Sequence, residues 1–406
     1  WTAVRLVDGS WAECTLHTPL DERRWAHLSV GVSQIDGFLK LHCSSEQLTE
    51  ASQSALAKPP ALGSKTPGIL IIAAAEDGQR QMHFNGKIDS PAIWIGDLDL
   101  DATGWADNQA RIFARWDFSK DISSCRVPDI GPNQLHGETI NFPARAMTGA
   151  NWDGAEMCWR HAPDHYGAIH FHEDDIYDFD WATDFSFQIP ENLKSGIYGI
   201  RLEQQGHHDT IPLFICPPRG RPTARLGLLV STFTYTVYGN HARPDYDPAW
   251  MDKVKAWGAY PWNPAEYPNY GCSTYNFHSD RSGICHASHC RPLFNLRPGY
   301  LTFGASTCSG LRHFQADSHL TTWLEAHDYD YDIITDEQLH NEGVSAIEGY
   351  SMVTTGSHPE YHTTRSLNAL THYRDQGGNL AYLGGNGFYW RVAIHPENPS
   401  LIEIRR

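Results

Sequence analysis

Apolar and polar residues alternate through the first hundred positions of the chain. The stretches WAHLSVGV, GFLKLHC, GILIIAAA and MHFNGKIDSPAIW follow this period of two, and Gly, Asp, Asn and Pro separate them. Short strands at this spacing are typical of an antiparallel sandwich. Asn85-Gly86 fits a tight hairpin turn between two such strands. The pattern therefore predicts a β-sandwich over residues 1–97, followed by an irregular connector over 98–145 in which Gly, Pro and Asn are frequent.

A second group of alternating segments follows the connector. DFSFQIPENLKSGIYGIRLEQ and DTIPLFICPP are expected to form strands joined by polar turns. This arrangement predicts a small immunoglobulin-like sandwich over residues 146–222. The prolines of CPPRGRP mark its end, because proline cannot continue a strand ladder.

The pattern changes after Ala224. ARLGLLVSTF is a continuous apolar run, as in a strand that is buried on both faces. An insertion rich in Gly, Pro and Tyr extends to about residue 298. Segments with helical and strand patterns then alternate: DSHLTTWLEAH, DYDIIT, DEQLHNEG, YSMVTTG, TTRSLNALTHYRDQGG and NLAYLGGNG. This alternation predicts a doubly wound parallel α/β sheet over residues 223–406.

Charge and cysteine usage narrow the class of protein. The formal charge is −17 and no Lys/Arg run is present, which argues against nucleic acid and anionic membranes as partners. No apolar run approaches the roughly 20 residues that span a bilayer. Nine cysteines, an odd number in a long chain, favour a reducing, cytoplasmic compartment. Because the chain has no initiator Met and ends abruptly at Arg406, we expect a fragment that is incomplete at both ends.

Three loops follow strands of the predicted α/β sheet. They are TFTYTVYGNH (232–241), GSHPEYH (356–362) and GGNGFYW (384–390). Ligands of open α/β sheets bind beyond the carboxyl ends of the strands, so we expect these loops to face one crevice. GCSTYNFHSDRSGICHASHCRP, from the insertion, is expected to fold over it.

These segments carry a family resemblance. TYTVYGN, STYNFHSDRSG, GSHPEY and LGGNGFYW, together with ARWDFS and GETINFPARAMTG in the connector, resemble the large (beta) subunit family of N,N-dimethylformamidase. The resemblance covers nearly the whole chain in collinear order. It is compatible with a laminin-G or concanavalin-like first domain and a class I glutamine amidotransferase-like last domain. It implies hydrolysis of the C–N bond of N-substituted formamides, a small companion subunit and an oligomer of subunit pairs.

The resemblance also implies a mononuclear iron bound by two tyrosinates and one glutamate. Carried onto this chain, the ligands are Tyr238, Tyr275 and Glu360, with Tyr235 and Tyr270 as competitors for the place of Tyr275. Phenolate and carboxylate are hard anionic ligands that suit Fe(III). Such an ion polarises an amide carbonyl and acidifies a bound water. His358, two residues before Glu360, is positioned to move the proton.

Other interpretations of the same residues stay open. Tyr side chains in loops usually serve packing or hydrogen bonding. Cys308, His358 and Glu360 imitate the order of a cysteine-dependent amidohydrolase, although Cys308 lacks a strand-to-helix elbow. The run Cys285–Cys290 is too compact to wrap one zinc ion, but His289 is a candidate to line the pocket. The β-sandwiches also permit a carbohydrate-binding or adhesive protein.

Overall fold

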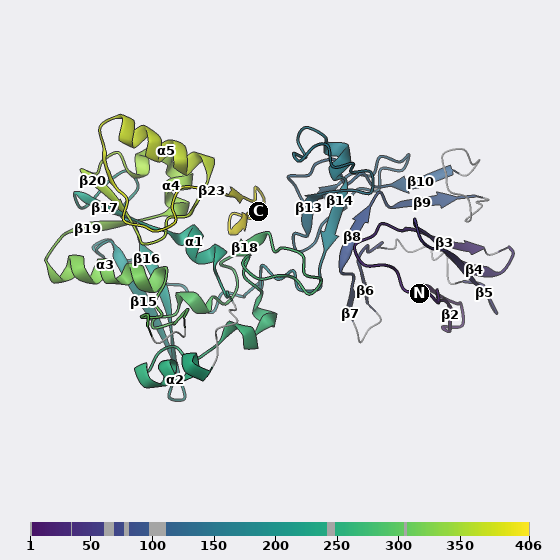
Figure 1. The fold of residues 1–406 in the computed structure, drawn as a ribbon, viewed down its shortest axis with the longest axis horizontal. Helices are drawn as coiled ribbons and strands as arrows, with labels where there is room; N and C mark the ends of the chain where they lie inside the picture. The colour runs from purple at the N-terminus through teal and green to yellow at the C-terminus, as the bar shows by residue number, and fades with distance from the viewer. Residues whose placement is uncertain are drawn as a thin grey trace.

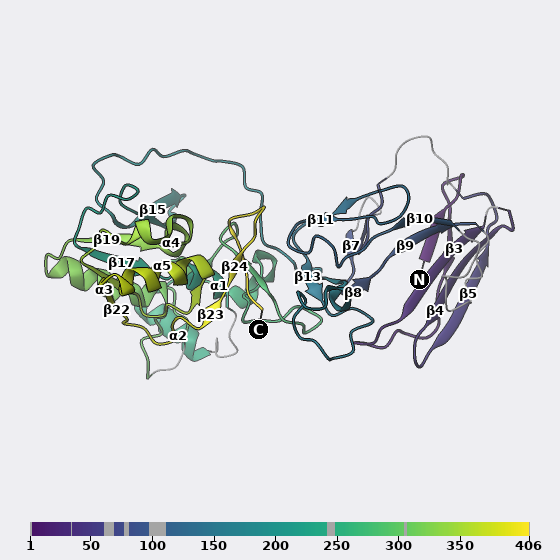
Figure 2. The ribbon, with the colours of Figure 1, turned by 90° about the horizontal axis from the view of Figure 1, so that it is seen from above.

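The chain forms two lobes that lie side by side along its longest axis (Figure 1). This computed structural model describes residues 2–33, 35–60, 69–76, 81–96, 111–241, 248–303 and 307–405. The β lobe (residues 2–171) contains small antiparallel sheets, and the α/β lobe (residues 196–405) contains the helices named below. The chain between them runs from one lobe to the other (Figure 2). Among the described residues, no helix has the length and apolar character needed to cross a bilayer.

The first sheet of the β lobe is a three-stranded meander built around β4 (Phe38–Ser44). Leu39, Leu41 and Cys43 alternate along β4 and are buried on one face, as the period-two pattern predicts. Both neighbours pair antiparallel with β4. The other strands of this part are β1 (Thr2–Arg5), β2 (Trp11–Cys14), β3 (His27–Ser33), β5 (Thr49–Ala55), β6 (Ala74–Glu76) and β7 (Gln81–His83).

A second sheet joins segments that the sequence pattern assigned to different domains. β14 (Ala168–Phe171) lies between β13 (Ala144–Met147) and β8 (Gly86–Asp89), so the boundaries at 97 and 145 do not separate independent sheets. Nearby pairs complete the lobe: β9 (Ala92–Ile95) with β10 (Arg111–Arg115), and β11 (Arg126–Val127) with β12 (Gly137–Glu138). The η2 turn (Pro163–Tyr166) precedes β14. Residues 97–110, at the start of the predicted connector, lie outside the described residues.

The Asn85-Gly86 turn differs from its prediction. β7 pairs with β6, whereas β8 pairs with β14, so the turn forms a corner between two sheets rather than a hairpin. The Asn85 side chain accepts a hydrogen bond from the backbone N–H of Glu173 at 2.8 Å. This long-range contact replaces the cross-strand contacts of a hairpin.

One predicted strand is absent from its expected place. Residues 182–190, which contain DFSFQIP, form neither helix nor strand, and Phe185 and Phe187 are 56% and 59% exposed. Alternation alone was misleading here, because a strand also needs a neighbour to pair its backbone groups. The following segments do pair, as β15 (Gly196–Gln204) and β16 (His207–Ile215). Gln205 and Gly206, both with positive φ, form the two-residue turn between them.

The α/β lobe contains a four-stranded parallel sheet in the order β19-β17-β20-β22. Leu228 and Val230 of β17 face a cluster with Phe314 and Leu324 of α3, whereas Leu229 faces a cluster with Leu339 of α4 and Leu370 of α5. Helices therefore cover both faces of the sheet. The strands and helices are β17 (Leu226–Val230), β19 (Tyr331–Thr335), β20 (Met352–Thr355), β22 (Asn379–Ala381), α1 (Thr232–Val237), α2 (Pro248–Trp257), α3 (Phe314–Ala326), α4 (Asp336–Glu342) and α5 (Thr364–Asp375).

Smaller elements complete the α/β lobe. β18 pairs with β25 and β25 with β24, while β21 pairs with β23. The strands are β18 (His286–Ser288), β21 (Tyr361–His362), β23 (Trp390–Arg391), β24 (Ala393–Ile394) and β25 (Leu401–Glu403); the short 3-10 turns are η3 (Pro264–Glu266), η4 (Pro268–Tyr270), η5 (Phe294–Leu296) and η6 (Gly343–Ala346). The laminin-G-like, immunoglobulin-like and amidotransferase-like folds stay predictions.

Candidate metal centre

The strand order of the parallel sheet places two loops at one edge. β17 and β20 are neighbours, but the chain leaves β17 for β19 on one side and enters β20 on the other, so the order reverses between them. Open α/β sheets bind ligands at such a reversal, beyond the carboxyl ends of the strands. Tyr238 follows β17 through α1, and Glu360 follows β20. The topology thus brings together two residues that are far apart in the sequence.

Glu360 is the centre of a buried polar cluster. Its Oε2 accepts a hydrogen bond from the Tyr238 hydroxyl at 3.0 Å, and its Oε1 lies 3.5 Å from the Tyr275 hydroxyl. The rings of Tyr238 and Tyr275 stack with centroids 3.9 Å apart and an interplanar angle of 14°. The structure therefore brings the three predicted ligands together around one carboxylate.

His358 completes the predicted set. Its Nε2 lies 3.0 Å from Oε2 of Glu360. The backbone carbonyl of His358 accepts a hydrogen bond from Thr234 Oγ1 at 2.9 Å, which ties its loop to α1. His358 is thus held beside the carboxylate, with Nε2 directed at Oε2.

The two alternative candidates for the second tyrosine ligand, Tyr235 and Tyr270, contact residues other than Glu360. Tyr235 is buried and its hydroxyl donates to the carboxylate of Asp317. Tyr270 stacks on Tyr267, with ring centroids 5.5 Å apart. Of these tyrosines, Tyr275 is the one that shares Glu360 with Tyr238.

The cluster contains further residues that were not predicted from the sequence. The hydroxyls of Tyr361 and Tyr275 share a short hydrogen bond, and Tyr389 hydrogen-bonds to Glu360. Tyr361 and Tyr389 lie in loops that the sequence had singled out, GSHPEYH and GGNGFYW. The sequence did not indicate that their side chains point toward Glu360. His313, whose ring lies 4.3 Å from that of Tyr238, had no sequence signal.

The backbone of His313 is strained. Its φ of 53° and ψ of −118° are unfavourable for a residue with a side chain. Together with Tyr238, His313 borders a cavity of about 10 Å³, comparable to a single water molecule. The other lining residues are His241, Asn295, Tyr300 and Thr302. Strain of this kind is typical of functional sites.

Burial and charge set the protonation of these groups. Burial, with the hydrogen bond to Tyr275, holds the pKa of Tyr238 well above its ordinary value. Burial also acts to raise the pKa of Glu360, but hydrogen bonds from His358, Tyr389 and Tyr238 outweigh it and lower that pKa. Burial holds the pKa of His313 well below its usual range. The lowered pKa of Glu360 and the raised pKa of Tyr238 favour an ionised carboxylate beside a neutral phenol.

This donor set fits a trivalent hard cation. Phenol and carboxylate oxygens 3.0 and 3.5 Å apart have the spacing of neighbouring ligands around one ion with metal–oxygen bonds of about 2 Å. A cation there would counter the burial cost of ionised phenols. Tyr238, Tyr275 and Glu360 are the residues that would hold it.

Asp317 of α3 supports the loop that carries Glu360. Its carboxylate accepts hydrogen bonds from Tyr235 and from the backbone N–H of Ser357, the latter at 2.5 Å. A Cβ at Gly356 would lie 2.5 Å from the same carboxylate, so this position has no room for a side chain. Asp317 thus links α1 to the Glu360 loop.

The remaining sequence candidates lie in other surroundings. Cys308 is exposed, and His289, expected to line the pocket, is also exposed. Cys285 Sγ lies 3.6 Å from His286 Nδ1, and His286 Nε2 lies 3.8 Å from Glu403. The compact Cys285–Cys290 run is therefore largely part of the β18–β25 packing.

The fold and the cluster together define an α/β protein with a tyrosine- and carboxylate-rich site at the strand-order reversal. Two comparisons identify the family. The family model described as "N,N-dimethylformamidase beta subunit-like, C-terminal" matches residues 144–406. The N,N-dimethylformamidase beta subunit of Paracoccus aminophilus is 35% identical over 424 residues, covering 96% of this chain and 55% of that protein. The corresponding Alcaligenes sp subunit is 37% identical over 354 residues, covering 82% and 45%.

The chain therefore belongs to the N,N-dimethylformamidase beta subunit-like family. It spans about half the length of the curated relatives it matches.

Proposed function

We propose that this chain carries the metal centre of an amidohydrolase that cleaves the C–N bond of N-substituted formamides. N,N-dimethylformamide, giving dimethylamine and formate, is the substrate indicated by the names of the relatives. The observation that carries the proposal is the convergence of Tyr238, Tyr275 and Glu360 at one carboxylate, with His358 beside it. The cofactor we propose is a mononuclear Fe(III).

The bound ion would act as a Lewis acid toward the amide carbonyl and would acidify a bound water. The protein residues orient the reactants and move protons. His358 donates from Nε2 to Glu360 at 3.0 Å, which leaves its other ring nitrogen, Nδ1, to take a proton from the attacking water and return it to the leaving amine. The aromatic rings around Glu360 limit the entry of bulk water, which strengthens charge interactions within the site.

The test compares three tyrosine variants. Tyr238→Phe and Tyr275→Phe remove one hydroxyl each while keeping the rings, so both should lose most of the iron and the phenolate-to-iron absorption band. Tyr270→Phe, which removes the hydroxyl of a tyrosine stacked on Tyr267, should keep both. Iron per chain, the visible spectrum and formamide hydrolysis are measured on the full-length protein. A fully active wild-type protein that is colourless and contains only zinc would refute the iron proposal.

A further inference from the structure

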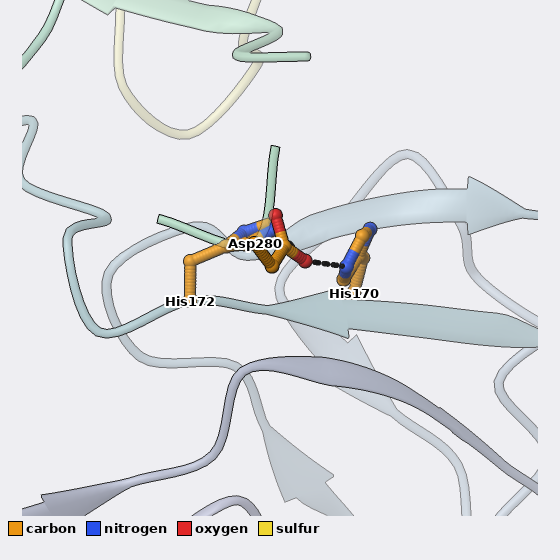
Figure 3. Close-up of side chains that lie close together, drawn as sticks. All are labelled: His170, His172 and Asp280. Carbon is orange, nitrogen blue, oxygen red and sulfur yellow. Dashed lines mark hydrogen bonds and ion pairs between the residues drawn. The ribbon is translucent and has the colours of Figure 1, made fainter. Parts of the chain in front are cut away.

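A second cluster, of side chains whose types could hold a metal ion, lies where the two lobes meet. His170 is in β14 of the β lobe and His172 follows that strand, whereas Asp280 is in the loop before β18 of the α/β lobe. Figure 3 shows Asp280 reaching from its loop toward the two histidines. His170 and His172 are buried, and the Asp280 side chain is 24% exposed. None of these residues takes part in the Glu360 cluster described above.

The donor atoms have the spacing of ligands around one small cation. Oδ2 of Asp280 lies 2.9 Å from His170 Nε2 and 3.6 Å from His172 Nε2. Metal bonds of 2.0–2.1 Å in tetrahedral geometry place neighbouring ligands roughly 3.3 Å apart. The ligand atoms of the three residues all lie within 4.8 Å of one another. Small adjustments would therefore seat an ion between them.

Neighbouring groups orient these ligands. Nδ1 of His172 lies 3.3 Å from the buried carboxylate of Asp175, and a proton held on Nδ1 by this carboxylate would free the Nε2 lone pair for an ion. Metal-binding histidines commonly have such a carboxylate partner. Ser282 Oγ lies 2.9 Å from His172 Nε2 and donates to the other oxygen of Asp280, Oδ1, at 2.6 Å. Its oxygen offers a fourth donor atom and leaves Oδ2 of Asp280 toward the histidines.

An alternative group, His172 with Asp175 and His278, is less suitable. The rings of His172 and His278 are nearly parallel, 6° apart in angle, with centroids at 3.6 Å. An ion bound to imidazole lies in the ring plane, and two stacked parallel planes cannot both contain it. The rings of His170 and His172 are inclined by 43°, so their planes can converge on one ion.

We propose that His170, His172 and Asp280 form a zinc-binding site that joins the two lobes. Two imidazoles, a carboxylate and a hydroxyl or water are ligands that Zn²⁺ accepts in a tetrahedral site. The ion would connect β14 to the loop before β18, at a position separate from the proposed iron. This inference does not rest on the proposed function.

The experiment measures zinc and iron separately in the full-length protein. After loading with Zn²⁺ and removal of excess ion, we expect one zinc per chain in addition to any iron. His170→Gln and Asp280→Asn should lose this zinc, whereas the matched control His278→Gln should keep it. Asp175→Asn should weaken zinc affinity about 10- to 100-fold, because an orienting partner is lost. Wild-type protein without this zinc would overturn the proposal, as would zinc lost from His278→Gln but kept by His170→Gln.

Two further measurements test whether a loss of zinc reflects misfolding of the variant or damage to the proposed iron site. The thermal midpoint of the wild type should rise on adding Zn²⁺, whereas that of folded His170→Gln should not; equal shifts would overturn the site. Tyr238→Phe should keep the zinc even after losing iron. Loss of zinc together with iron in Tyr238→Phe would show that the two sites are not independent and would contradict the assignment.

Discussion

Gly384 lies so close to Pro359 that a Cβ on the glycine would be 2.4 Å from Cδ of the proline. Through this contact, the GGNGFYW loop packs closely against the loop that carries His358 and Glu360. Backbone hydrogen bonds from Phe388 to Pro359 and from Trp390 to Glu360 continue the same contact. The position of Glu360 thus depends on a residue that has no side chain.

The first prediction follows from that contact. Gly384→Ala should displace the Glu360 loop, lower the free energy of unfolding by about 1–3 kcal/mol and reduce bound iron, as expected for overpacking. Gly385→Ala is the matched control, because its Cβ would meet its nearest neighbour, Nδ1 of His358, at 3.8 Å. Urea unfolding and iron per chain give the comparison. Equal behaviour of the two variants would show that the loop adapts and that the contact is unimportant.

A second prediction concerns the charge over the Tyr238 ring. The guanidinium carbon of Arg312 lies 4.6 Å from the ring centroid, where its positive charge would repel a cation bound to the hydroxyl of Tyr238. Arg312→Gln should therefore strengthen iron binding by about 1 kcal/mol, roughly fivefold. Lys253→Gln is the control, since Lys253 makes a comparable contact with Trp257 at 5.1 Å. Competition with an iron chelator measures the iron affinity of both variants. If Arg312→Gln binds iron as tightly as the wild type does, the charge of Arg312 has no effect on iron binding.

A third prediction separates the metal and thiol mechanisms. Cys308 is exposed, whereas Glu360 is buried among the tyrosines. Cys308→Ser should keep most of the formamide hydrolysis, because water activated by a metal needs no thiol. Glu360→Ala should lose both iron and activity. Inactive Cys308→Ser with its iron in place would favour the cysteine-dependent alternative.

The acid stability of the protein gives a fourth prediction. Burial acts to raise the pKa of Glu403, but its interactions with His286 and Arg405 outweigh burial and lower that pKa to about 2 from 4.5. The titratable groups that act with it are His286 of β18, Cys285 just before that strand, His395 and Arg405. A depressed carboxyl pKa stabilises the fold above pH 4.5, and this stabilisation is lost as the pH falls toward 2.

Glu403→Gln should therefore lower the free energy of unfolding at pH 7 by about 1–3 kcal/mol, a range reduced for the partial exposure of the side chain. The difference from wild type should shrink as the pH falls from about 4.5 toward 2. Glu348→Gln, which alters an exposed glutamate, is the control. Chemical unfolding at several pH values tests the trend, and a difference that does not depend on pH would rule out this linkage.

The fifth prediction concerns assembly. The relatives are named beta subunits, which implies a companion chain. We expect the full-length chain to co-purify with a small partner subunit and to form a closed oligomer of such pairs, two-fold symmetry being the commonest. Light scattering on co-expressed material measures the mass. A single-chain mass with full amidase activity would show that neither partner nor oligomer is required.

Parts of the site were predictable from local patterns. The apolar run at Leu228–Val230 identifies a strand buried on both faces, and the loops after such strands are where Tyr238 and Glu360 lie. Long-range pairing was not visible: β14 joins β8 across the predicted domain boundaries, and the Phe185–Phe187 alternation has no paired strand. The strained backbone of His313 depends on tertiary packing, which no local pattern reports.

The place of β17 in the sheet has a consequence for folding during synthesis. It is the first strand of this sheet to be made, yet Leu226 pairs with Tyr331 and Met352, which are made much later. Such distant pairing slows folding, because a long loop must close before the contacts form. The apolar strand β17 therefore has no pairing partner while the insertion is translated. During that interval it can aggregate with other chains.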